Sequence, residues 1–91
     1  MFKRRLFSCT IYGDEANEYV EGKISGIIDT VTNPYCERIQ YAIRSGEING
    51  VKYRTLRFEA TNRQLNKLIK MVGNHYGNFC KIVFNQTWEV S

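Results

Sequence analysis

The sequence predicts an α+β domain whose elements follow in the order β-α-β-β-α-β. Three observations lead to this prediction: segments with apolar residues at every second position, an Asn-Gly pair between two such segments, and two segments with apolar residues at every third or fourth position. The chain has 91 residues, of which 43% are hydrophobic and 13% aromatic. This composition supports one small core, so we expect a single domain over residues 1–91.

A β-hairpin centred on Asn49-Gly50 is the strongest local signal in the chain. Asn-Gly is the preferred pair for a two-residue hairpin loop, because both loop residues adopt positive φ. In the resulting register Ile43 faces Leu56. The further apolar pairs on this face are Tyr41 with Phe58 and Ile39 with Ala60. A slip by one residue would mix apolar and polar positions, so the pattern selects this register.

A helix is predicted directly after the hairpin. Residues 61–64 match a capping box, with Thr61 as N-cap and the Gln64 side chain reaching back. Apolar residues then recur at helical spacing: Leu65, Leu68, Ile69, Val72 and Tyr76. Gly73 and Gly77 disfavour continuation, so we expect the helix to end between them. Apolar alternation returns over residues 79–90 and predicts the last strand, with core-facing positions at Cys80, Ile82 and Phe84.

The first third of the chain leaves two interpretations open. Residues 5–12 alternate as a strand, with Phe7, Cys9 and Ile11 toward the core. A helix is then expected to begin at residues 13–15, where acidic side chains favour the positive end of the helix dipole. However, Gly22, Gly26 and a β-branched run up to residue 32 are poor helix formers. A strand over residues 19–31 is therefore the alternative, and Asn33-Pro34 ends either element.

These elements together predict the ferredoxin-like split β-α-β fold (βαββαβ), an antiparallel sheet with both helices on one face. The second face of the sheet stays open. We expect it to collect a polar, basic and aromatic set: Ser8, Thr10, Tyr12, Arg44, Tyr53, Thr55, Arg57, Lys81, Val83 and Asn85, with Gly46 opposite Tyr53. We therefore expect the functional residues to lie on this face.

Charge is distributed unevenly along the chain. The formal net charge is +4, but residues 14–37 carry six acidic side chains against Lys23 alone. Residues 38–81, in contrast, carry nine basic side chains against Glu47 and Glu59. This division suits a domain with one basic and one acidic surface, and ordinary solvated charge is the alternative interpretation.

Several kinds of chemistry find no support in the sequence. The three cysteines are widely spaced without a CxxC pair, and His75 is the single histidine, so we expect reduced thiols, no metal and no cofactor. Cys9 and Cys80 are expected to pack as small hydrophobes. Phosphate-loop, metalloprotease and serine-hydrolase motifs are absent, and we expect no enzymatic activity. No apolar run approaches the roughly 18 residues of a membrane span, and no signal-peptide core is present, so we expect a cytoplasmic protein.

Three families that share this fold were compared with the sequence. Acylphosphatases place a phosphate-binding loop after the first strand, where residues 12–18 are acidic here. Cas2-like nucleases place an aspartate near that point, but Asp14 has no partner carboxylate. Residues 51–58 resemble the third strand of RNA-recognition motifs, with Tyr53 outward and Phe58 inward. Both internal glycines of that motif are missing and Thr55 replaces its second aromatic, so the similarity is one of architecture.

The leading hypothesis is a non-catalytic protein that binds nucleic acid, RNA or a single strand, through the open sheet face. Its proposed contact residues are Arg44, Arg57 and Lys81 for phosphates, Tyr53 with Tyr12 for bases, and Lys52 with Arg54 as an extension toward the hairpin tip. The first alternative is a phage-type inhibitor or antitoxin-like protein that blocks a host protein such as a nuclease. The second is a homodimeric adaptor that buries Val83, Ala42 and Tyr12 between two open faces.

Overall fold

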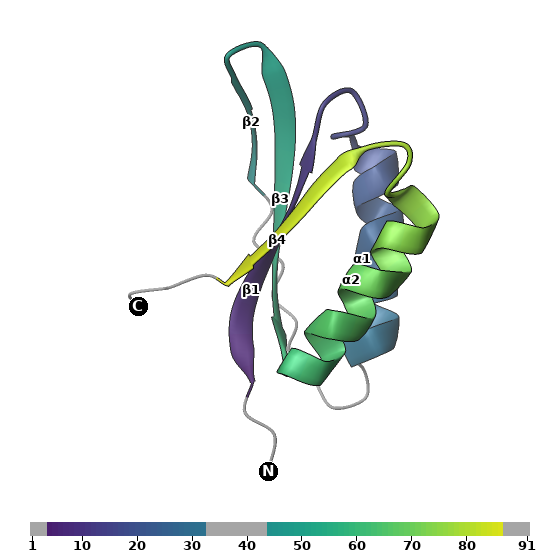
Figure 1. The fold of residues 1–91 in the computed structure, drawn as a ribbon. Helices are drawn as coiled ribbons and strands as arrows, with labels where there is room; N and C mark the ends of the chain where they lie inside the picture. The colour runs from purple at the N-terminus through teal and green to yellow at the C-terminus, as the bar shows by residue number, and fades with distance from the viewer. Residues whose placement is uncertain (1–3, 33–43, 87–91) are drawn as a thin grey trace.

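The computed structural model describes residues 4–32 and 44–86, which form a four-stranded antiparallel sheet with two helices packed on one face (Figure 1). The elements are β1 (Arg5–Tyr12), α1 (Glu18–Thr32), β2 (Arg44–Ile48), β3 (Val51–Ala60), α2 (Asn62–Tyr76) and β4 (Lys81–Gln86), with strand order β2-β3-β1-β4. The predicted ferredoxin-like fold is thereby confirmed. The alternative strand over residues 19–31 is wrong, because these residues lie in α1.

The hairpin between β2 and β3 has the predicted register. Arg44 pairs with Thr55 and Gly46 with Tyr53, and both loop residues have positive φ, 52° at Asn49 and 80° at Gly50. All five residues of β2 are exposed, because this strand forms an edge of the sheet. The apolar pairs predicted at positions 39–43 lie outside the described residues.

The core lies between the sheet and the two helices. It consists of inward residues from β1 and β3 and one stripe from each helix: Phe7, Cys9, Ile11, Leu56, Phe58, Ala60, Ile24, Ile28, Leu68 and Val72. The Phe58 ring is central, with ring centroids 6.0 Å from Phe7 and 6.3 Å from Phe84. Burying such rings removes a large apolar area from water, which is the main stabilising term available to a domain of this size.

Helix α2 has the predicted capping box. The Gln64 backbone N–H donates to Thr61 Oγ1 at 3.2 Å, and the Thr61 backbone N–H donates to Gln64 Oε1 at 2.9 Å. At the other end the Gly77 N–H donates to the Gly73 carbonyl, and the helix ends at Tyr76, between the two glycines as predicted. Two of the free N–H groups that every helix start presents are thus satisfied by one side-chain pair.

Helix α1 begins later than predicted, at Glu18 rather than at residues 13–15. Gly13 has φ of 95°, which turns the chain away from β1 and is incompatible with a helix start there. The cap is Asn17, whose Oδ1 accepts from the Val20 N–H at 3.0 Å. The unfavourable glycines Gly22 and Gly26 are tolerated because both lie on the exposed face, while the opposite face packs into the core.

Candidate functional site

The open face of the sheet is organised in rows that run across the strands. The row nearest the hairpin loop that crosses all four strands is Gly46, Tyr53, Tyr12 and Lys81, in the order β2-β3-β1-β4. The second row is Arg44, Thr55, Thr10 and Val83, and the third contains Arg57, Ser8 and Asn85. The three strand ladders thus bring together the open-face residues that the sequence predicted, including Ser8 and Asn85, which are 77 positions apart in the chain.

The first row places two tyrosines on neighbouring strands and an ammonium group at one end. Tyr12 and Tyr53 face each other across the central strand pair, and both are half-buried. On the β4 side, Lys81 Nζ lies 5.5 Å from the centroid of the Tyr12 ring, a cation–π contact. On the β2 side, the phenol end of Tyr53 lies over Gly46, where a Cβ atom would be 2.6 Å from Tyr53 Oη and 2.8 Å from Cζ.

Hydroxyl groups fill the centre of the second row. The Oγ1 atoms of Thr10 and Thr55 are 3.0 Å apart and share a hydrogen bond. Thr10 is only 8% exposed although it lies on the open face, because the neighbouring side chains cover it. Side chains therefore fill the centre of this face, and a ligand would bind on top of them and not between the strands.

Five of the seven predicted contact residues lie on this face: Tyr12, Arg44, Tyr53, Arg57 and Lys81. Lys52 and Arg54, which were expected to extend this surface toward the hairpin tip, lie near the tip but on the other side of the sheet. Strand alternation turns both residues toward the helix-covered side, since Arg54 pairs in register with the buried Ile11. Arg54 Nε donates to Glu21 Oε1 of α1 at 2.9 Å, and the pair is 19% and 14% exposed. Arg54 therefore joins a strand to a helix and is not available to an open-face ligand.

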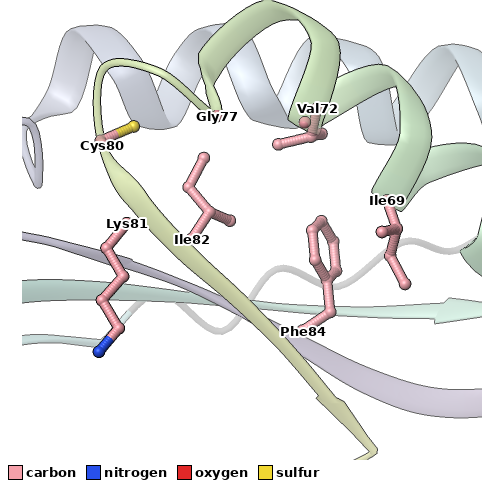
Figure 2. A pocket seen from close by; sticks show the side chains of 8 residues that line it. Ile69, Val72, Gly77, Cys80, Lys81, Ile82 and Phe84 are labelled. Atoms are coloured by element: carbon pink, nitrogen blue, oxygen red, sulfur yellow. The ribbon is translucent and has the colours of Figure 1, made fainter.

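A second feature, which sequence reasoning did not find, is a cleft of about 300 Å³ between α2 and β4 (Figure 2). Ile69, Val72, Ile82 and Phe84 point into it, whereas the Lys81 side chain points away from it. The alternation of β4 thus divides its residues between the cleft and the open face. From the sequence these apolar residues are predicted to lie in the core. Whether α2 covers the β4 side chains completely depends on the distance between the two elements, which the sequence does not give.

The thiol beside this cleft is poorly suited to nucleophilic chemistry. Cys80 is half-buried, and its Sγ donates to the Tyr76 carbonyl at 3.6 Å. Burial and, to a lesser degree, the Glu15 carboxylate raise the pKa of Cys80 above 9.0. Burial together with Cys80 raises the pKa of Cys9, inside the core, to about 12. Since the thiolate is the nucleophile and metal ligand, both cysteines are held in their inert form at neutral pH.

The described residues were also considered as a metal site and as a membrane-spanning segment. Over residues 4–32 and 44–86, no three His, Cys, Asp or Glu side chains gather closely enough to hold a metal ion. Within the same ranges, neither helix is long and apolar enough to cross a membrane.

Comparison with known proteins supports the fold alone. No family model and no curated protein match the chain. Among solved structures, a putative PII-like signalling protein from Thermus thermophilus superimposes with a TM-score of 0.64 at 13% identity, covering 97% of this chain and 92% of that one. The de novo designed protein Foldit4 gives 0.61 at 10% identity, with coverages of 97% and 100%. Ribosomal protein S6 of the 30S subunit from Thermotoga maritima gives 0.52 at 9%, with coverages of 93% and 89%. At identities of 9–13%, these likenesses carry no function over to this chain.

Proposed function

We propose that the protein is a non-catalytic binding protein whose open sheet face holds a strand of nucleic acid, either RNA or single-stranded DNA. The observation that carries the proposal is the row in which Tyr53, Tyr12 and Lys81 lie side by side across three strands. Aromatic rings can stack on unpaired bases, and a neighbouring cation can neutralise a phosphate of the same strand.

The basic residues around this row support the same proposal. Arg44 and Arg57 lie on the open face one and two rows away from the tyrosines, toward the opposite end of the sheet from the hairpin loop. The acidic side chain of Glu21 lies on the helix side, where it is bound to Arg54. Among the strand residues of the open face, the cations Arg44, Arg57 and Lys81 outnumber the one carboxylate, Glu59, and this excess attracts a polyanion.

Fluorescence titration with labelled mixed-sequence single-stranded RNA and DNA, at several salt concentrations, tests the proposal. Lys81→Ala should weaken binding to every sequence and reduce the slope of log K against log salt by roughly 0.7–1. Tyr53→Ala should lose about 1–3 kcal/mol of binding free energy and leave this slope unchanged, because a base stack involves no counterion. Lys70→Ala is the matched control, since Lys70 is an exposed cation on α2.

The titration also has outcomes that contradict the proposal. Equal losses for Lys70→Ala and Lys81→Ala would mean that net charge, and not the open face, governs binding. Absence of binding at tens of micromolar protein in low salt would reject nucleic acid as the ligand.

A protein partner is the second candidate, and the hairpin tip is the observation that favours it. Ile48 and Val51 pair beside the Asn49-Gly50 loop and are 60% and 46% exposed. Exposed apolar side chains that continue an aromatic row are typical of protein contact surfaces. Ile48→Ser would weaken such a contact and leave nucleic-acid binding unchanged, which pull-down and titration measure separately.

A further inference from the structure

We infer that Gly46 is a positioning residue for nucleic-acid binding, because it holds the Tyr53 ring in its binding orientation before the ligand arrives. The inference rests on the proposed function. Gly46 and Tyr53 are direct partners across the β2–β3 pair, and both lie on the open face. Gly46 makes no stacking or ionic contact itself, so its effect on the ligand passes through the tyrosine.

The geometry leaves no room for a side chain at position 46. An ideal Cβ there would lie 2.6 Å from Tyr53 Oη and 2.8 Å from both Cζ and Cε1. These distances are shorter than real Cβ contacts, so the ring occupies the space in which a side chain would stand. The ring therefore leans across β2 and rests on its backbone, the arrangement in which a strand glycine is covered by a cross-strand aromatic.

A ring that rests on the backbone of β2 has fewer rotamers available to it than a ring surrounded by solvent. When binding has to order a mobile side chain, the affinity falls by about 2- to 12-fold. This loss does not occur where the ring is already ordered in the free protein. Any side chain at position 46 forces the Tyr53 ring away from β2, since the backbone beneath it cannot move out of the hairpin register. Gly46→Ala should therefore weaken binding by about 2- to 12-fold while the Tyr53 side chain is still present.

A double-mutant cycle tests whether Gly46 acts through Tyr53. The dissociation constant for single-stranded RNA is measured for the wild type, Gly46→Ala, Tyr53→Ala and the double variant. Tyr53→Ala should weaken binding by about 5- to 150-fold. Gly46→Ala should then have no further effect in the Tyr53→Ala background, because the ring that it displaces is gone. Gly26→Ala is the control for a glycine-to-alanine change, since a Cβ at this exposed helix position has nothing within 4 Å.

A second measurement reports on the geometry without any ligand. The α-protons of Gly46 should show a ring-current shift in the NMR spectrum of the wild type, and this shift should disappear in Tyr53→Ala. Circular dichroism of Gly46→Ala verifies that the sheet is retained. If that variant loses its sheet, the ring-current shift in the wild type still decides whether the ring lies over Gly46.

The possible failures are distinguishable. If the wild type does not bind single strands, the proposed function is rejected. If Tyr53→Ala weakens binding but Gly46→Ala does not, the positioning role is rejected and the proposed function stands. An equal effect of Gly46→Ala with and without the Tyr53 ring also rejects the positioning role, because it would show that Gly46 acts on the strand or the ligand directly.

Discussion

Replacing Arg54 with alanine should destabilise the fold and leave ligand binding at the open face unchanged. Glu21 Oε1 accepts from Arg54 Nε at 2.9 Å and lies 2.8 Å from a terminal guanidinium nitrogen. The two side chains are only 19% and 14% exposed, so the pair is intermediate between an exposed ion pair and a buried one. Exposed pairs contribute about 0.2–1 kcal/mol, and removing one partner of a buried pair costs about 3–5 kcal/mol. We therefore expect Arg54→Ala to lower the free energy of unfolding by about 1–3 kcal/mol.

Urea unfolding followed by circular dichroism measures this change. Lys52→Ala is the matched control, because Lys52 lies on the same strand and the same side of the sheet but is exposed, and it should change stability by less than about 0.5 kcal/mol. A cycle with Glu21→Gln should show coupling, with the double variant less destabilised than the sum of the single variants. The reasoning is refuted if Arg54→Ala and Lys52→Ala are equally mild, or if the effects of Arg54→Ala and Glu21→Gln simply add.

Other perturbations test the helix cap and the buried thiol. Thr61→Ala removes the capping box of α2 and should lower the free energy of unfolding by about 0.5–2 kcal/mol in urea; a loss below about 0.3 kcal/mol would contradict a stabilising role for the box. The folded protein raises the pKa of Cys9 from 9.0 to about 12, so the folded state keeps this proton while the unfolded state releases it. Stability should therefore fall as pH rises through this window, by up to about 1.4 kcal/mol per pH unit from this group, and Cys9→Ala should show a shallower fall in the same measurement. In the native protein at pH 7, iodoacetamide should leave Cys9 unmodified, as peptide mass spectrometry would show; modification there without unfolding would mean that the core is open to reagents.

Features specified by neighbouring residues could be predicted from the sequence. The Asn49-Gly50 turn determines the hairpin register, because the turn and the apolar alternation agree. The first turn of α1 was misplaced because two acidic residues after Gly13 match a helix start as well as Asn17 does, and the positive φ of Gly13 is what decides between them.

Features that depend on distant contacts could not be predicted. Alternation alone gives the side of the sheet on which Arg54 lies, but its interaction with Glu21 depends on how α1 crosses β3. In the same way, the sequence places Tyr53 opposite Gly46, whereas the direction in which the ring leans depends on its rotamer in the folded sheet. The open-face positions that strand alternation predicts are therefore confirmed, whereas Lys52 and Arg54, expected to extend this surface near the hairpin tip, lie on the other side of the sheet.

Mapping amide chemical-shift changes during titration with single-stranded RNA tests most directly whether the open face is the binding surface. We expect the largest changes at Tyr12, Tyr53, Thr55 and Lys81, which occupy neighbouring positions in the first two rows. Changes along α1 and α2 should be small, because both helices pack on the opposite side of the sheet (Figure 1). Changes centred on the cleft between α2 and β4, or absent throughout the titration, would contradict the account.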